Sequence, residues 1–213
     1  MNLLSAKFFI FLSLLFVFST MANAQTFYGT TDVEVFREGR GKEFLKKEES
    51  PLKDEDFAIF KGLNYFSVDK NFRIEAEFTR TAGKKYFRMP TSSGETKKYT
   101  KFGILKFKLN GKDYFLNVYQ SDADVLAKFP EYKDILFVPF KDATNGKETY
   151  GGGRYINIKM LSSKKVILDF NLAYNPSCAY GSDRYSCPIP PKENFLQVEI
   201  NAGEKSYRHS TAK

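Results

Sequence analysis

Side chains suited to chemistry gather in the last third of the chain, and their types point to ligand binding. The candidates are Asp142, Glu148, Tyr150, Arg154, Asp169, Asn171 and Tyr174. An arginine offers paired donors to anionic or sugar groups, carboxylates accept hydrogen bonds, and tyrosine rings stack against a ligand ring. These types predict a pocket for a small polar or anionic ligand, with Arg154 as its cation and Tyr150 or Tyr174 as its stacking ring.

The same residues allow a catalytic alternative, in which Glu148 and Asp169 serve as acid and base. Two carboxylates support glycoside hydrolysis only when they lie about 5 to 9.5 Å apart. A carboxylate beside Arg154 more often forms an ion pair that fixes a loop, because such pairs are common outside active sites. We therefore assign no catalytic residue, leave enzyme activity open and keep the structural ion pair as a further interpretation. Convergence of these side chains on one open cleft would favour the pocket.

Residue types exclude several common forms of catalysis. The single histidine, His209, lies in a polar tail at 208–213. Nucleophilic sites of the Ser-His-Asp or Cys-His kind need a positioned imidazole, and the usual zinc, copper and iron sites need more histidine or free cysteine. The turn at 142–146 is too short to hold calcium alone, and the glycines at 151–153 lack the spacing of a phosphate-binding loop. We expect no metal and no other cofactor.

Residues 1–24 have the organisation of an export signal. Lys7 supplies a positive charge, Phe8–Val17 is almost wholly apolar, and Ala22-Asn23-Ala24 is a small-residue cleavage site. A membrane-spanning helix needs about 20 apolar residues, and this run is shorter. No cysteine follows the cleavage site for lipid attachment. We expect cleavage near Ala24, a periplasmic or secreted protein, and no transmembrane anchor in the mature chain.

The two cysteines are expected to form a local disulfide, because exported proteins fold in an oxidising compartment. Closing the short loop between Cys178 and Cys187 contributes about 2.5 to 3 kcal/mol by loop entropy. A redox pair is the weaker alternative, because the spacing is not C-x-x-C. The surrounding irregular stretch, 174–191, is either a functional loop or a plug over an open end of the β structure.

The positive charge does not indicate a nucleic-acid binder. The formal net charge is +8 at pH 7, but the lysines lie in scattered doublets. Proteins that bind nucleic acids usually gather such charge on one face. The expected partners are a small polar or anionic ligand or a component of the cell envelope, and no nucleic acid.

Apolar residues alternate with polar ones through most of the chain, which predicts β-strands. The composition of 22 Phe and 13 Tyr without Trp also favours a pleated sheet. Asn110-Gly111 between two alternating runs predicts a hairpin. Strands are expected at 71–79 and 84–89, on both sides of that turn, and in later runs that end at Phe140, Met160, Phe170 and Ile200.

Helices are expected mainly near the N-terminus, at 32–47 and from Ser50-Pro51 to Gly62, with a short one at 121–129. No linker or repeat divides the chain, so residues 25–207 are expected to form a single domain. The predicted fold is mainly β, an antiparallel β-sandwich or a partly closed β-barrel with short N-terminal helices.

Four motifs in the C-terminal third carry a resemblance to a known family. They read PFKDATNGKETYGGGRY, LDFNLAYNPSCAY, YSCPIPPKENFL and INAGEK, with weaker matches at SPL and GLNYFSVD upstream. The chain resembles a bacterial exported family of unknown function, domain of unknown function 1684. The resemblance implies an exported protein but no activity. Its signature residues match here as Asp142, Thr144, Glu148, Thr149, Tyr150, Arg154, Asp169, Asn171, Tyr174, Asn175, Cys178, Tyr180 and Cys187.

Two functions remain open from the sequence. The leading prediction is an exported bacterial envelope protein whose β domain binds a ligand or serves a structural role without catalysis. The alternative is a carboxylate-based hydrolase that acts on a saccharide or another small polar substrate.

Overall fold

The computed structural model describes residues 30–159 and 163–207. The expected export signal at 1–24, the expected tail at 208–213 and the strand end expected at Met160 lie outside the described residues. The helices are α1 (Thr30–Phe44), α2 (Asp54–Phe57) and α3 (Ala123–Lys128). The strands are β1 (Arg73–Pro90), β2 (Thr96–Leu109), β3 (Lys112–Ser121), β4 (Ile135–Phe140), β5 (Arg154–Lys159) and β6 (Lys165–Asp169). Short 3-10 helices are η1 (Lys70–Phe72), η2 (Pro130–Asp134), η3 (Phe170–Leu172), η4 (Ser177–Tyr180) and η5 (Lys192–Asn194).

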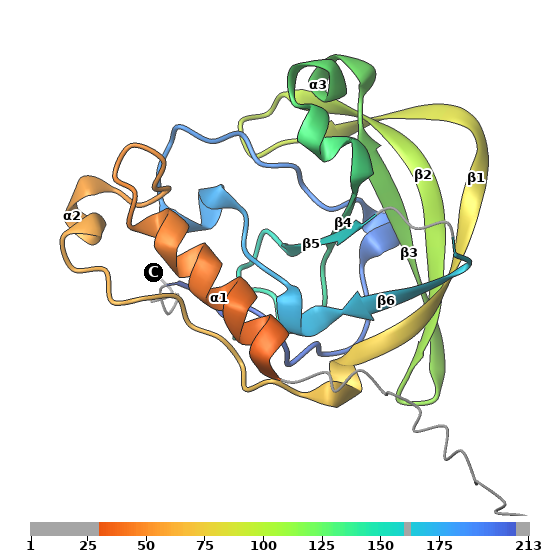
Figure 1. Ribbon diagram of the computed structural model, residues 1–213, viewed down its shortest axis with the longest axis horizontal. Helices are drawn as coiled ribbons and strands as arrows, with labels where there is room; N and C mark the ends of the chain where they lie inside the picture. Colours follow the sequence, from red (N-terminus) through yellow and green to blue (C-terminus); the bar gives the residue numbers. More distant parts are fainter. Residues whose placement is uncertain (1–29, 160–162, 208–213) are drawn as a thin grey trace, which may run out of the picture.

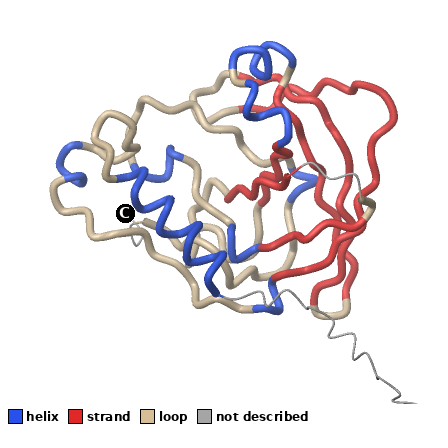
Figure 2. The backbone as a smooth tube through the Cα atoms, in the orientation of Figure 1, coloured by secondary structure: helices blue, strands red, loops and turns tan. Residues whose placement is uncertain are grey.

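The described strands form one curled antiparallel sheet of six strands, in the order β5-β4-β3-β2-β1-β6. The sheet bends into a partly closed barrel (Figures 1 and 2). Beyond η3 the chain returns to the edge of β5, where the backbones of Tyr155 and Tyr174 exchange hydrogen bonds of 2.9 and 3.0 Å. The mainly β fold is confirmed, and the structure selects the barrel over the sandwich.

β1 and β2 form one long hairpin that bends at irregular positions. The turn residues of the next hairpin, Asn110 and Gly111, have φ of 50° and 76°, as the tightest hairpin turns require. Two strands were predicted, at 71–79 and 84–89, but β1 is one continuous strand. The predicted break corresponds to a register shift between Arg80 and Lys85. β2 has a register shift of its own, between Lys101 and Gly103. A side chain at Gly103 would place its Cβ 2.4 Å from the ring of Phe78, so this position requires glycine.

The main core lies on one face of the sheet and is built by alternating residues. Leu116 of β3, Val138 of β4, Ile156 of β5 and Leu168 of β6 are buried there. Their neighbours in sequence point to the opposite face, as strand geometry requires. Because alternate residues are buried in the core, the residues between them form the second face of the sheet.

The strand predicted to end at Ile200 is absent from the described sheet. Leu196 and Ile200 do alternate into the core. However, this segment runs beside the chain that follows β4, where Leu196 N donates to Lys141 O at 2.8 Å and Ala143 N donates to Val198 O at 3.0 Å. Alternation reports burial on one side, whereas a strand also needs a continuous ladder of backbone bonds, so the prediction was wrong.

Asn194 fills a gap where β3 and β4 diverge. Its Oδ1 accepts a hydrogen bond from Asn117 N at 2.8 Å, and its Nδ2 donates to Asn117 O at 2.9 Å. Nδ2 also donates to Pro139 O at 2.7 Å. The side-chain amide therefore satisfies backbone groups that a neighbouring strand would otherwise pair.

α1 lies across one side of the barrel (Figure 1). It was predicted at 32–47, and it buries Val33 and Phe44 against the body. The second predicted helix shortens to α2. The third was predicted at 121–129 and begins at Ala123, because Asp122 caps α3 by accepting from Val125 N at 3.1 Å. Among the described residues, no helix has the length and apolar character needed to cross a bilayer.

Candidate functional site

Arg154 and Asp142 form a buried ion pair. Arg154 Nη2 donates to Asp142 Oδ2 at 2.9 Å, and both side chains are 0% exposed. Asp142 Oδ1 accepts from the backbone and the hydroxyl of Thr144 at 2.9 and 2.5 Å. Arg154 also donates to three carbonyls, those of Ile200, Ala202 and Glu204. This pair holds the loop after β4 against the C-terminal segment, and it presents no surface to a ligand.

Asp169 and Asn171 form a second structural cluster at the end of β6. Asn171 N and Nδ2 each donate to Asp169 Oδ1 at 2.9 Å. The Asn171 amide also exchanges hydrogen bonds with the backbone of Asp69, at 2.9 Å from N and 2.8 Å to O. Arg73 Nε lies 3.9 Å from Asp169 Oδ2. Both predicted site residues therefore join the end of β6 to the start of β1.

Glu148 stands in different surroundings from Asp169. Its side chain is exposed, and its Oε2 lies 2.8 Å from Lys205 Nζ. The two border a surface cavity of about 230 Å³, which is also lined by Asn64, Tyr65 and Ser206. The two carboxylates of the hydrolase alternative thus belong to separate environments.

A row of aromatic rings crosses the second face of the sheet. Its members are Phe36 of α1, Tyr174, Tyr155 of β5, Phe137 of β4, Tyr99 of β2, Tyr119 of β3 and Phe87 of β1. Neighbouring centroids in this aromatic row lie between 4.7 Å and 6.4 Å apart. Such spacings are those of favourable ring pairs. Strand alternation places them here, because Phe137 lies between the core residues Leu136 and Val138.

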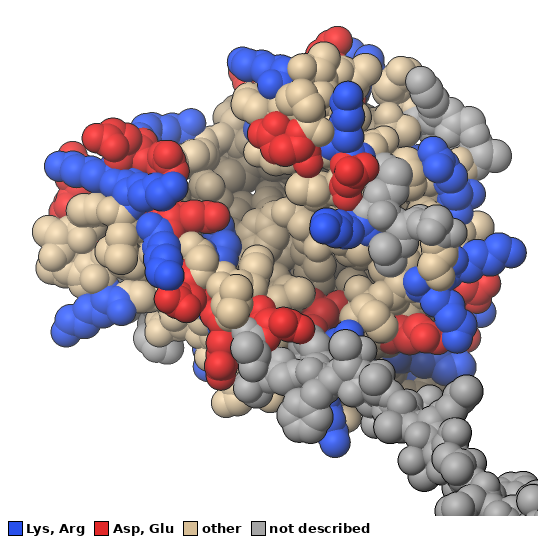
Figure 3. Space-filling view, in the orientation of Figure 1, with Lys and Arg blue, Asp and Glu red and all other residues tan. Residues whose placement is uncertain are grey.

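The elements that carry the aromatic row surround a hollow in the molecule (Figures 1 and 3). Figure 3 shows a hollow beside α1, over the region where Figure 1 places β4 and β5. Its interior carries neither acidic nor basic side chains, which lie around its rim (Figure 3). Tyr99, Phe137 and Tyr174 are half-buried, whereas Tyr119 and Tyr155 are buried. The half-buried rings are therefore partly accessible from outside the protein.

The tyrosine hydroxyls of the row are neutral. Burial raises the pKa of Tyr99 to about 12. Burial also raises the pKa of Tyr174 to about 12, against the opposing effects of Arg40 and the side chain of Asn157. Tyr155 donates its hydroxyl to Pro188 O at 2.5 Å. At neutral pH these groups act as hydrogen-bond donors and acceptors without charge.

Tyr150, another predicted residue, is half-buried. Gly152 makes room for its ring, since a Cβ there would lie 2.2 Å from Tyr150. Of the seven predicted site residues, Tyr174 belongs to the aromatic row.

Arg40 lies at the α1 end of the aromatic row. Its guanidinium is 4.9 Å from the centre of the Tyr174 ring, and its Nη2 is 3.9 Å from Glu204 Oε2. Burial acts to lower the pKa of Arg40, but Tyr180 and Glu204 raise it overall, so the side chain is charged. The Arg40 side chain is 19% exposed. The row thus ends on a cation that solvent reaches.

Glu204 supports the Arg40 end of the aromatic row through buried hydrogen bonds. Its side chain is 1% exposed, and burial raises its pKa. Tyr180 donates its hydroxyl to Glu204 Oε1, and Asn175 donates to both carboxyl oxygens at 3.0 and 3.1 Å. The carboxyl group is therefore enclosed by hydrogen bonds and supports the tyrosines and Arg40 around it.

Sequence reasoning missed most of these residues. Glu204 and Tyr155 stand inside the quoted motifs, so their positions were visible without their roles. Arg40 lies in a polar stretch of α1, and Tyr99 and Phe137 read as ordinary strand residues. Their common surface arises only when α1, three strands and the Tyr174 segment come together. Among the described residues, no group of three or more His, Cys, Asp or Glu is placed to hold a metal ion.

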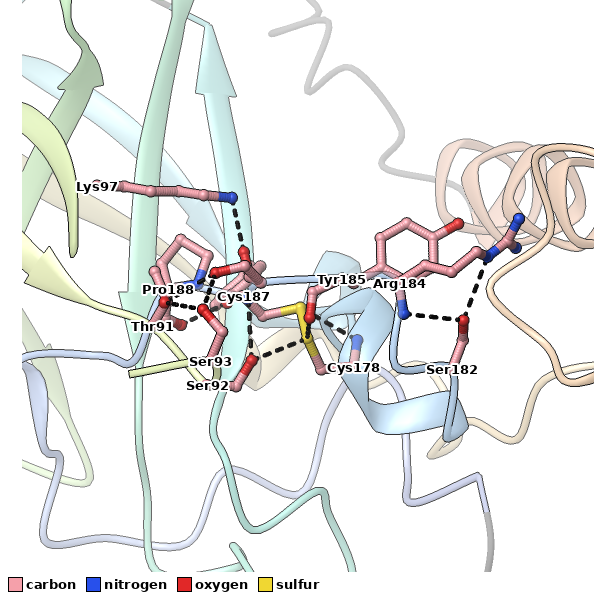
Figure 4. The surroundings of a disulfide bond; sticks show 12 residues. Thr91, Ser92, Ser93, Lys97, Cys178, Ser182, Arg184, Tyr185, Cys187 and Pro188 are labelled. Atoms are coloured by element: carbon pink, nitrogen blue, oxygen red, sulfur yellow. Dashed lines mark hydrogen bonds between the residues drawn. A yellow bond between two sulfur atoms is a disulfide. The ribbon is translucent and has the colours of Figure 1, made fainter. Parts of the chain in front are cut away.

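A disulfide joins Cys178 and Cys187, as predicted, with Cα atoms 6.1 Å apart (Figure 4). Cys187 N donates to Ser92 Oγ at 3.1 Å, and Lys97 Nζ donates to Ser186 O at 2.6 Å. Figure 4 shows these residues of the β1–β2 turn region packed against the loop. On its other side, Arg184 donates to Ser50 O. The irregular stretch 174–191, which this disulfide closes and which we call the stapled loop, thus connects the tip of the β1–β2 hairpin to the segment between α1 and α2.

Comparison with known proteins places the chain in a family. The model of a protein family of unknown function, DUF1684, matches residues 58–205. The solution NMR structure of an uncharacterized protein of Haloarcula marismortui is similar, with 36% sequence identity and a TM-score of 0.65. That similarity covers 83% of this chain and 93% of the other. No curated protein matches the chain. The resemblance seen in the motifs is confirmed, and the chain belongs to the family of proteins of unknown function DUF1684.

Proposed function

We propose that this protein is an exported, non-catalytic binding domain of the bacterial cell envelope, which takes a small polar ligand with a ring, such as a saccharide, on the aromatic row. The single observation that carries the proposal is the continuous row of aromatic rings, of which Tyr99, Phe137 and Tyr174 are half-buried. The export signal predicted at 1–24 supports the location. The disulfide supports an oxidising compartment.

The chemistry of the hollow suits a sugar ring. Ligand sites are concave, mostly apolar and aromatic, with a few polar groups that fix orientation. Tyr99 and Tyr174 combine both properties, because each offers a ring face for C–H groups and a neutral hydroxyl for hydrogen bonds. Asn157, which is exposed next to Tyr174, adds an amide.

Binding without a chemical step fits the carboxylates better than hydrolysis does. Glu148 is paired with Lys205, and Asp169 accepts two hydrogen bonds from Asn171. Glu204 lies beside Arg40 at the end of the aromatic row, but it is enclosed by Tyr180 and Asn175. A hydrolase pair needs both carboxylates at one open site, whereas Glu148 is exposed and Asp169 is buried in its own hydrogen-bonded cluster.

A thermal-shift titration with saccharides tests the proposal, using Tyr99→Leu and Tyr86→Leu as matched variants. Tyr99 belongs to the aromatic row and pairs with Phe87 of β1. Tyr86 is the residue before Phe87, so its side chain lies on the opposite face of the sheet, where it is 56% exposed. Saturation at 100 times the dissociation constant adds about 2.7 kcal/mol to stability, which is a shift of several degrees.

We expect Tyr86→Leu to keep this shift and Tyr99→Leu to lose most of it. Equal shifts in both variants would place the ligand elsewhere. The absence of any shift across mono- and oligosaccharides would refute the binding function.

A further inference from the structure

We infer that the ligand is an acidic saccharide, with a carboxylate on its ring that is held by Arg40. The inference rests on the proposed function and names the ligand class of the same hollow. It follows from the position of Arg40, from its contacts with neighbouring carboxylates and from the neutral hydroxyls of the row tyrosines.

α1 sets the position of Arg40 relative to the aromatic row. Phe36 and Arg40 are four residues apart, so they lie on the same face of the helix. Both contact the ring of Tyr174, Phe36 with centroids 6.4 Å apart and Arg40 at 4.9 Å from the ring centre. A ring stacked on Tyr174 or its neighbours would therefore have its edge close to this guanidinium.

Two carboxylates lie near Arg40, but neither holds it by a short hydrogen bond. Glu204 Oε2 lies 3.9 Å from Nη2, which is beyond hydrogen-bond distance. The oxygens of Glu204 already accept hydrogen bonds from Tyr180 and Asn175. The hydrogen bond of Arg40 runs from Nη1 to Glu43 Oε2 at 3.4 Å, and the Glu43 side chain is 60% exposed. A desolvated ligand carboxylate would compete well with this long contact to an exposed group.

The tyrosines beside Arg40 support the same preference. The hydroxyls of Tyr99 and Tyr174 are neutral at physiological pH. The geometry therefore places the Arg40 guanidinium against the ring of Tyr174, at one end of the aromatic row. This arrangement matches a sugar with a single carboxylate, because a planar guanidinium donates two parallel bonds to a carboxylate.

Isothermal titration of the secreted protein tests the inference with glucuronic-acid oligosaccharides and with glucose oligosaccharides of the same length. We expect the acidic series to bind at least about tenfold more tightly at low salt, and the preference to shrink as salt screens the charge. In Arg40→Gln the two series should bind equally, with the affinity for the neutral series retained. Arg88→Gln, which removes an exposed arginine from β1, should behave as the wild type.

The outcomes separate the two proposals. Binding of both series with equal affinity to the wild type would overturn the acidic ligand and leave the binding function intact. Binding of neither would refute the binding function itself. A preference that persists in Arg40→Gln would assign the carboxylate to another cation and overturn the role of Arg40. If that variant does not fold, Glu43→Gln decides, because removal of the competing carboxylate should strengthen acidic binding, and an unchanged preference would contradict the inference.

Discussion

Two arginines show how this protein separates structure from its candidate binding surface. Arg154 is 0% exposed and makes four hydrogen bonds, to Asp142 and to three backbone carbonyls. Arg40 is 19% exposed, and its hydrogen bond goes to an exposed glutamate. Both leave Nε without a partner, but only Arg40 is open to solvent. The same side chain thus joins segments in one region and remains available to a ligand in the other.

The comparison also separates the residues that look chemical from those that form an open surface. The dense polar motif after β4 is used for internal hydrogen bonds, because a buried ion pair needs every neighbouring donor and acceptor. The aromatic row is built instead by residues from distant parts of the chain. The segment richest in polar residues therefore joins the loop after β4 to the C-terminal segment and does not form an open site.

The largest expected effect is on stability, from Arg154→Met compared with Arg40→Met. Removing Arg154 leaves the Asp142 carboxylate buried without its partner, which should lower the free energy of unfolding by about 3 to 5 kcal/mol. Removing Arg40 loses a stacking contact with Tyr174 and should cost about 1 kcal/mol. Urea denaturation of both variants measures the difference. Equal losses would break the distinction between the two arginines.

A smaller effect is expected from the disulfide that ties the stapled loop to the hairpin. Replacing Cys178 and Cys187 by serine should lower the free energy of unfolding by about 2.5 to 3 kcal/mol through loop entropy. Because Pro188 of this loop accepts the Tyr155 hydroxyl, saccharide affinity should also fall. Denaturation and titration of the double variant check both. An unchanged midpoint would show that the hydrogen bonds to Ser92 and Ser186 hold the loop without the bond.

The smallest effect concerns the pH dependence contributed by Glu204. Burial raises its folded pKa above the ordinary value of 4.5, so the folded protein keeps a proton that the unfolded chain releases. Stability contributed by this group is therefore present below about pH 4.5 and is lost as pH rises through the folded pKa. In Glu204→Gln that loss should disappear, because the amide does not titrate.

Denaturation at several pH values between 4.5 and 8 measures this difference. We expect the stability of Glu204→Gln relative to the wild type to increase with pH. A constant difference would indicate that Arg40 compensates the Glu204 charge fully, and it would weaken the inference that Arg40 is available to a ligand carboxylate.

Much of the local structure could be predicted from the sequence. The hairpin at Asn110-Gly111, the strands that became β3, β4 and β6, and the Cys178–Cys187 bond follow from turn chemistry, alternation and short loop closure. The strand predicted at Leu196–Ile200 shows the limit of such reasoning. Its residues do alternate into the core, but the segment that its backbone bonds to is not a strand. The export signal at 1–24 stays a prediction.

The sequence by itself determined a β-rich member of its family with a local disulfide, because these properties depend on neighbouring residues and on short motifs. Only the tertiary structure decided which polar residues are consumed internally. Arg154 bonds to carbonyls 46 to 50 residues away, and the Asn171 amide bonds to Asp69 across 102 residues. The aromatic row likewise depends on strand order and on how α1 crosses the sheet. Such pairings are set by the topology of the whole chain, and no local pattern encodes them.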